Sequence, residues 1–306
     1  MPKLNVQQNN QNVIQAFKNA LAIGNLKGII ASDGSHNFST AGSNRNLLDN
    51  PWWGSGEVVN QRGVTAKPSN NQYGIDRWIV DSGADANTMA FGTSGITFTI
   101  SASSIWNTQR TKNPSAWSGK TLTASVLLSD GTIKSGTAAF TLGTNTVFYT
   151  DNALTLSLNT SGYFVVAVKA SQTIRAVKLE LGSVSTLAND APPNYAEELA
   201  KCKYYFRRIT NIGRGRLFIG VGFSGGVEVP NIFGVGNEMR KTTSLAVTYS
   251  GSFVVSAGTD IAVTGISRNE NNSNFGLSFA ASGITPYSLY SILGSAGAYI
   301  DISADL

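Results

Sequence analysis

Short runs of strand length, separated by turn signals, fill most of this sequence and limit the folds open to it. Runs such as ITFTIS (96–101), TLTASVLL (121–128) and YFVVAV (163–168) alternate apolar and polar residues or are apolar throughout, and both patterns are typical of β-strands. The turn signal SDG follows the second of these runs, and TSG directly precedes the third. About eight such strands at short intervals predict a β-sandwich, specifically a jelly roll, over residues 45–191.

The sequence of residues 210–306 predicts a second β-sandwich. This region is richer in glycine and aromatic residues than residues 45–191. Runs such as GRLFIGVGF and SLAVTYSGSFVVSAG place small residues within and between strands, which permits tight turns and close approach of backbones. The last run, AYIDISADL, alternates apolar and polar residues. We expect this run to be a closing strand that is tied into a sheet.

One segment, PPNYAEELAKCKYYFRRI at 192–209, predicts an amphipathic helix between the two β-rich parts. Asn194 suits an N-cap, Glu197 follows it at the spacing of a capping box, and acidic residues precede basic ones. The apolar residues recur at steps of four and three and form one stripe. The stripe consists of Tyr195, Leu199, Cys202, Phe206 and Ile209. Either it packs on a neighbouring domain, or it is a short seam between copies of the chain.

Residues 1–44 predict a separate N-terminal segment. NVIQAFKNALAIG has apolar residues on one helical face and a glycine where the helix would end. The small, polar, glycine-rich stretch that follows predicts a linker or an extended arm. One short helix and an arm cannot bury a core, so we expect this segment to dock onto its own copies or onto a larger assembly.

The composition narrows the classes of partner. Charged residues make up 13% of the chain, against about 25% in an average globular protein. The net charge is +5, and the basic residues are scattered rather than clustered, which argues against nucleic acid as a partner. The N-terminus lacks a signal-peptide pattern and no apolar run is long enough to span a membrane. We therefore expect no membrane partner and synthesis in a cytosol.

Few residues suit catalysis or metal binding. His36 and Cys202 are the single histidine and the single cysteine, so a Cys/His zinc site is excluded. A lone histidine in a polar, glycine-rich arm is also not expected to serve a Ser-His-Asp triad. The glycine-rich runs lack the context of phosphate-binding loops. A pair of carboxylates for glycoside hydrolysis stays possible. Calcium ligands also stay possible, although no loop has a calcium motif; the candidates are Asp49, Asn50, Asp76 and Glu180. Our prediction is that the chain has no catalytic site, no metal and no cofactor.

Aromatic residues in polar loops suggest contacts with sugars. Trp52 and Trp53 are adjacent, between a proline and a glycine, so we expect at least one ring to point outward. Trp106 and Arg110 lie close by in sequence and are expected between strands. Tyr287 and Tyr290 are equally credible contacts in the second β domain. The other two tryptophans, Trp78 and Trp117, are expected to pack inside the fold.

Several segments taken in order resemble a known family. NLLDNPWW, VVNQRG, YGIDRWIV, VKLELGSVST and YAEELAKCKYYF are similar to a domain common in bacteriophage and prophage tail-fibre and minor structural proteins. NEMRKTTSLAVTYSG and AYIDISADL resemble the distal domain that follows in those proteins. The resemblance covers about residues 45–306. It implies a jelly roll similar to carbohydrate-binding modules, a homotrimeric fibre and a C-terminal tip domain. It also implies that the helix at 192–209 lies near the three-fold axis.

The function that we expect from the sequence is that of a phage virion protein. It would be a trimeric fibre that adsorbs to a glycan on the host cell by multivalent binding and joins other virion proteins through residues 1–44. The virion would be its location, because lysis releases assembled particles without a secretion signal. The alternatives are a capsid decoration or head fibre of the same architecture, a virion-associated glycan depolymerase, and a free cellular lectin.

Overall fold

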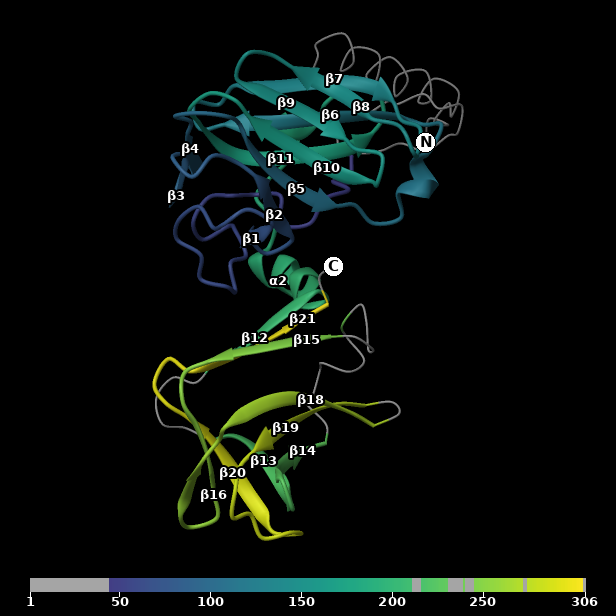
Figure 1. Ribbon diagram of the computed structural model, residues 1–306. Helices are drawn as coiled ribbons and strands as arrows, with labels where there is room; N and C mark the ends of the chain where they lie inside the picture. The colour runs from purple at the N-terminus through teal and green to yellow at the C-terminus, as the bar shows by residue number, and fades with distance from the viewer. Residues whose placement is uncertain (1–43, 211–215, 231–238, 240–244, 272–273, 305–306) are drawn as a thin grey trace, which may run out of the picture.

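The computed structural model describes residues 44–210, 216–230, 239, 245–271 and 274–304 (Figure 1). Two β-rich units lie end to end, and one helix, α2 (Tyr195–Lys203), lies between them. The predicted N-terminal helix, the arm and His36 fall outside the described residues. Within the described part of the chain, no helix has the length and apolar character needed to cross a membrane.

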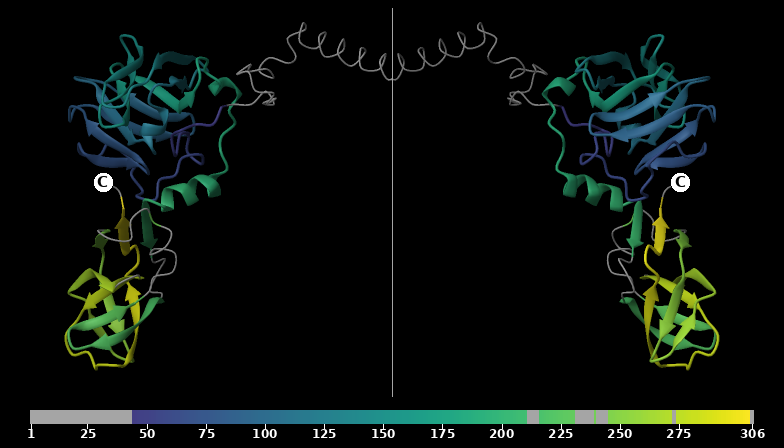
Figure 2. Two further views of the ribbon diagram at one scale, coloured as in Figure 1. Left: turned by 90° about the vertical axis from the view of Figure 1, so that its right-hand side faces the viewer. Right: turned by 90° about the vertical axis from the view of Figure 1, so that its left-hand side faces the viewer.

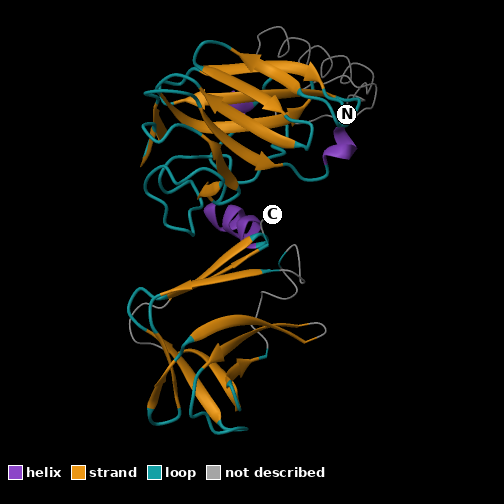
Figure 3. Ribbon diagram, viewed as in Figure 1, coloured by secondary structure: helices purple, strands orange, loops and turns teal. Residues whose placement is uncertain are grey.

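The first unit, residues 44–191, is a sandwich of two antiparallel sheets (Figure 3). The six-stranded sheet has the order β1 (Gln72–Ile75), β2 (Trp78–Ser82), β5 (Ile105–Arg110), β10 (Tyr163–Val168), β9 (Leu154–Leu158), β8 (Thr146–Thr150). The five-stranded sheet has the order β3 (Thr88–Gly92), β4 (Gly95–Thr99), β11 (Gln172–Leu181), β6 (Thr121–Leu128), β7 (Ile133–Ala139). Two short 3-10 helices, η1 (Pro114–Trp117) and η2 (Leu187–Asn189), lie outside the sheets. The predicted β-sandwich is confirmed.

The inner faces of the two sheets meet in one apolar core. Phe98, Leu122 and Val126 from one sheet lie in it, with Leu156 and Phe164 from the other. Alternate residues of each strand face inward, as the period of two requires. Trp78 is also in this core and Trp117 packs at its edge, as expected from the sequence.

Strand β5 of the first unit was not predicted. Trp106 and Arg110 do not lie between strands but on β5, which pairs with β2 and β10. The core-facing side chains of β5 include Asn107 and Gln109, so the strand lacks an apolar alternation. Gln109 is satisfied because its amide accepts from the N–H of Asp49 at 2.8 Å and donates to the Asp49 carbonyl at 2.8 Å.

The helix is shorter than predicted. Asn194 caps it as expected, its side chain accepting from the N–H of Ala196 at 2.9 Å. The helix ends at Lys203, and residues 206–209 belong to strand β12 (Phe206–Thr210). Strand pairing with the end of the chain satisfies these backbone groups, and this tertiary contact overrides the helical spacing of the side chains. The prediction of one helix up to residue 209 is therefore wrong.

The second unit, residues 206–304, contains two further antiparallel sheets. The smaller has the order β12, β21 (Tyr299–Ser303), β15 (Ala246–Ser250). The larger has the order β17 (Asp260–Ala262), β16 (Phe253–Ser256), β20 (Leu289–Gly294), β13 (Arg216–Phe223), β14 (Gly226–Val229), β19 (Asn274–Ala280), β18 (Gly265–Asn271). Buried residues such as Val255, Phe279, Ile292, Ile300 and Ile302 form its core. The expected closing strand is confirmed as β21, which lies between β12 and β15 and returns the chain to the junction (Figure 2).

Arginine side chains link the two units. Arg208, on β12, bonds the Asp301 carboxylate through two nitrogens at 2.7 and 2.6 Å and donates to the carbonyl of Arg62 at 2.7 Å. Arg62, in the first unit, lies 3.5 Å from the ring centre of Phe206 and 3.0 Å from an oxygen of Asp76. The Asp301 carboxylate raises the pKa of Arg208. The bidentate bond to Asp301 positions Arg208 within the second unit. The bond from Arg208 to Arg62 and the stacking of Arg62 on Phe206 then orient the second unit against the first.

Candidate functional site

The outer face of the six-stranded sheet differs from its apolar inner face. On β5, Trp106 and Thr108 point away from the core, because their neighbours Ile105 and Asn107 are buried on the inner side. Across the β5/β10 pair, Ala167 lies opposite Trp106 and Val165 lies opposite Thr108. Side chains from neighbouring strands therefore meet on one outward surface.

Two adjoining hollows of about 260 and 340 Å³ lie on this surface. They share Asp81 and Asn159, and we call them together the sheet groove. Its lining consists of Asn71, Ile79, Asp81, Ser104, Trp106, Thr108, Asn145, Thr155, Ser157, Asn159, Ser161, Tyr163, Val165, Ala167 and Lys169. The groove follows β5 and β10, since Trp106 and Lys169 line one hollow and Tyr163 lines the other.

Small residues form the floor of the sheet groove. Thr108, Val165 and Ala167 are buried although they lie on the outward side of the sheet. Trp106 rises beside this floor with 42% of its surface exposed. Its indole N–H donates to the Ser104 hydroxyl at 2.8 Å, which holds the orientation of the ring. The result is a recess bordered by an accessible, oriented aromatic ring.

Most polar side chains that line the sheet groove are uncharged amides and hydroxyls. The amide oxygen of Asn159 accepts from the backbone N–H groups of Ser161 and Tyr163 at 3.0 and 2.9 Å, which fixes the amide plane. Lys169 donates to the Thr150 hydroxyl and to the Asp151 carbonyl, both at 3.1 Å. The lining therefore offers oriented hydrogen-bonding groups with little net charge.

Trp52 and Trp53 lie elsewhere, and the expectation of an outward ring is wrong. Their segment pairs with β11, since the N–H of Trp53 donates to the Arg175 carbonyl and the N–H of Val177 donates to the Pro51 carbonyl. Successive side chains then point to opposite sides of the sheet. Trp53, 1% exposed, enters the core with its ring centre 5.0 Å from that of Trp78.

Trp52 points to the opposite side and is covered by a later part of the chain. It is 6% exposed and packs with Ala176 and with Leu187 of η2. Sequence alone could not reveal this cover, because η2 follows Trp52 by more than a hundred residues. The two tryptophans thus pack on opposite faces of the five-stranded sheet, Trp53 in the core and Trp52 beneath η2.

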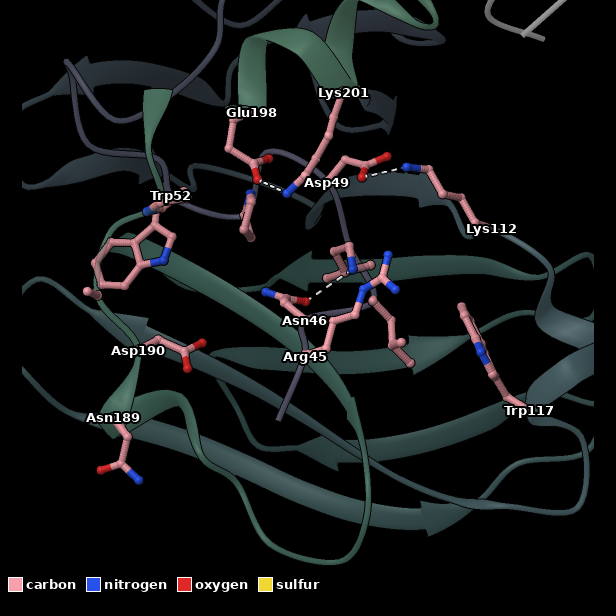
Figure 4. Close-up of a pocket in the computed structure, with 15 residues that line it drawn as sticks. Arg45, Asn46, Asp49, Trp52, Lys112, Trp117, Asn189, Asp190, Glu198 and Lys201 are labelled. Atoms are coloured by element: carbon pink, nitrogen blue, oxygen red, sulfur yellow. Dashed lines mark hydrogen bonds and ion pairs between the residues drawn. The ribbon is translucent and has the colours of Figure 1, made fainter. Parts of the chain in front are cut away.

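Apart from the sheet groove, a hollow of about 520 Å³ lies between residues 45–52 and helix α2, and Trp52 borders it (Figure 4). Its charged side chains largely satisfy one another. Asp49 pairs with Lys112 at 2.8 Å, and Glu198 pairs with Lys201, as Figure 4 shows. Because these charges are already compensated, this hollow is a weaker candidate than the sheet groove.

The remaining predicted contacts are divided between the two units. Arg110 lies at the end of β5 opposite Tyr163, which lines the sheet groove. Tyr287 lies in the second unit, 93% exposed, in a loop where its own φ is +64°. Tyr290 is buried, and its hydroxyl accepts from the N–H of Thr285 at 2.9 Å. Tyr290 therefore supports the Tyr287 loop from inside, contrary to the prediction of a surface contact.

The predicted apolar seam does not form one face. Cys202 and Phe206 are buried inside this chain, and Ile209 packs against the core of the second unit. Burial, with the nearby carboxylates of Asp76 and Asp49, raises the pKa of the Cys202 thiol. Only Tyr195 and Leu199 of the stripe remain accessible on the helix. The stripe fails because Phe206 and Ile209 belong to a strand, where side chains alternate instead of following a helical face.

The three carboxylates among the candidate calcium ligands face cations of the protein itself, while the Asn50 side chain bonds backbone groups. Asp76 pairs with Arg62, Asp49 with Arg77 and Lys112, and Glu180 with Lys178. Among the residues that the structure describes, no group of three or more His, Cys, Asp or Glu side chains is placed to hold a metal ion.

Sequence reasoning missed several residues of the sheet groove, Thr108, Asn159 and Tyr163 among them. Tyr163, Val165 and Ala167 occupy alternate positions of YFVVAV and decrease in size along the strand. That pattern defines a face, but the sequence does not say which face is covered. Comparison of the chain with protein families, curated proteins and solved structures gives no match.

Proposed function

We propose that the sheet groove binds a glycan without large net charge. The observation that carries this proposal is the exposed, oriented ring of Trp106 beside a recessed floor of small residues. Indole rings offer a flat apolar surface for a sugar ring. The amides and hydroxyls of the lining suit sugar hydroxyls, which both donate and accept hydrogen bonds. A few convergent polar groups around an apolar platform are typical of small-ligand sites.

The length of the sheet groove suits a short oligosaccharide. Trp106 and Arg110 are four residues apart on β5, and Tyr163 lies opposite Arg110. At about 3.3 Å per strand residue, the two aromatic side chains are separated by roughly 13 Å along the sheet. We expect Trp106 to hold one sugar ring and Tyr163 to contact a second part of the same chain.

The lining favours binding over hydrolysis. Asp81 is the one carboxylate among the described residues that line the sheet groove. Glycoside hydrolysis usually requires a pair of carboxyl groups on either side of the scissile bond. The depolymerase alternative would thus need a second acid from outside the described lining.

We further propose that the chain acts as a trimeric fibre of a phage virion that adsorbs to a host-cell glycan. Support comes from the ordered sequence segments that resemble phage fibre proteins and from the elongated, two-unit shape (Figure 2). Tyr195 and Leu199 remain available on the helix for contacts with other copies. Three weak sites on one fibre would give avidity. Residues 1–44 would join other virion proteins, on the tail or on the capsid, where the chain would serve as a decoration or head fibre.

The test compares two exposed aromatic residues on an array of host surface glycans. Trp106→Ala should lower the apparent affinity at least about tenfold, which corresponds to about 1.4 kcal/mol. Tyr287→Ala removes an exposed ring in the other unit and should leave binding unchanged. Normal binding by Trp106→Ala with loss of binding by Tyr287→Ala would move the site to the second unit. Light scattering on the full chain tests the trimer separately, and a monomer at all concentrations would contradict it.

A further inference from the structure

A buried lysine lies on the outward side of the five-stranded sheet. Lys178 and Glu180 are two residues apart on β11, so their side chains share one face. Both side chains have no exposed surface. Residues 183–191, which include η2, cover them before the chain continues into α2. Lysine and glutamate are almost never fully buried without close partners, so this pair calls for an explanation.

Asp190 completes the cluster from the covering segment. The Lys178 Nζ atom lies 2.7 Å from Oδ1 of Asp190, and Glu180 Oε2 lies 3.7 Å from the same nitrogen. The Thr186 hydroxyl touches both partners, 2.8 Å from Nζ of Lys178 and 2.5 Å from Oε2 of Glu180. Amine, carboxyl group and a second carboxylate are thus held together, with Lys178 and Glu180 fully buried and the Asp190 side chain 10% exposed.

We propose that Lys178 and Asp190 are joined by an amide bond formed within the folded chain. The Lys178 nitrogen attacks Cγ of Asp190, whose Oδ1 it already contacts. Near-attack geometry requires reacting atoms about 3–3.5 Å apart, and the 2.7 Å contact with Oδ1, which is bonded to Cγ, holds Nζ beside its target. One C–N bond forms and one C–O bond breaks. The ammonium nitrogen loses two protons, the departing carboxyl oxygen gains two, and water leaves. No oxidant, reductant or cofactor is needed.

Glu180 is the proton carrier of this step. It accepts a proton from Nζ, either directly or through the Thr186 hydroxyl, and returns it to the departing oxygen. Glu180 ends the reaction unchanged, as a general base and acid does. Removal of the ion pair also removes two charges from a mostly buried site, where each carries a desolvation penalty.

The chain contains a matched ion pair for comparison. Lys134 and Asp151 also approach to 2.7 Å, but their side chains are 20% and 31% exposed. The second partner of Asp151 is the Tyr149 hydroxyl, not a carboxylate. We expect this pair to remain ionic, because water screens it and the second partner of its carboxylate is a hydroxyl group.

The mass of the intact full-length chain tests the bond. We expect it to be lighter than the mass calculated from the sequence by one water. Fragmentation of a protease digest should give one branched peptide that links Lys178 to Asp190. A mass equal to the calculated value overturns the proposal, and so does a missing water traced to another position.

Variants separate the bond from its mechanism. Glu180→Gln should keep the full calculated mass, whereas Asp190→Asn should lose ammonia instead of water if it reacts. Lys178→Met keeps a buried side chain of similar length and should give the calculated mass in a folded protein, as judged by circular dichroism. A cross-linked Glu180→Gln variant would overturn the role of Glu180. The Lys134→Met control should leave the loss of one water unchanged.

Discussion

The two β units present opposite kinds of outward sheet surface. In the first unit, β5 and β10 carry small residues below an exposed tryptophan, and the result is the sheet groove with its polar lining. In the second unit, β13 and β20 carry Ile219, Val221 and Leu289 outward, and all three are exposed. Strand alternation is the same in both units. The size and polarity of the outward residues decide whether a sheet face is a recess or an apolar surface.

The largest expected loss of stability follows from substitutions in the two cores beneath these surfaces. Trp53→Ala should lower the free energy of unfolding of the first unit by about 3–5 kcal/mol, because a large buried ring is lost. Phe279→Ala should do the same in the second unit. Calorimetry of each variant should show which transition moves. A shift of both transitions by either variant would mean that the units unfold as one.

The next largest effect on stability is expected from a substitution at the junction between the two units. Arg208→Met removes two bonds to Asp301 and one to the Arg62 carbonyl while keeping most of the side-chain volume. We expect a cost of about 2–3 kcal/mol, as for hydrogen bonds to charged groups. Small-angle scattering should show a wider range of angles between the units. An unchanged scattering curve and unchanged stability would show that other contacts, such as that of Arg62 with Phe206, hold the junction without Arg208.

A smaller effect on stability is expected at an ion pair of the first unit, between Asp151 and Lys134. Burial by itself raises the pKa of Asp151, but Lys134, Tyr149 and two backbone N–H groups outweigh it, so the folded-state pKa is lowered. The stability that this carboxylate adds is present above its unfolded pKa of about 3.9 and is lost as the pH falls through the lower folded value.

Asp151→Asn should therefore destabilise the chain at neutral pH, by less than about 1 kcal/mol because the pair is partly exposed. Urea unfolding at a series of pH values should show this difference shrinking below about pH 4. A difference that stays constant down to about pH 2 would contradict the assignment.

The sequence predicted the elements with strong local patterns and missed those set by distant contacts. The apolar runs predicted the sandwich, and Asn194 predicted the start of the helix. β5 was missed because Gln109 is satisfied by the backbone of Asp49, sixty residues earlier. Phe206 and Ile209 were placed on a helix because pairing with β21 comes from the other end of the chain.

The candidate site was predicted only in part for the same reason. Trp106 was identified as an aromatic in a polar setting, but the side chains that surround it come from three other strands and from loops. The adjacent Trp52 and Trp53 were the stronger candidates for exposed rings in the sequence. Pairing with β11 instead turns Trp53 into the core, and η2 covers Trp52. A local pattern reports which residues can bind, and the sheet partners decide which of them stay accessible.

The most direct test of the sheet groove is the access of an aqueous quencher to tryptophan fluorescence. Trp106 is the exposed member of the five tryptophans, since Trp52, Trp53, Trp78 and Trp117 are buried. An oligosaccharide that binds in the groove should protect the accessible emission from quenching, and Trp106→Phe should remove the accessible emission together with its protection. Calorimetric binding of the same oligosaccharide to the unaltered protein with no change in quenching would contradict a site at Trp106.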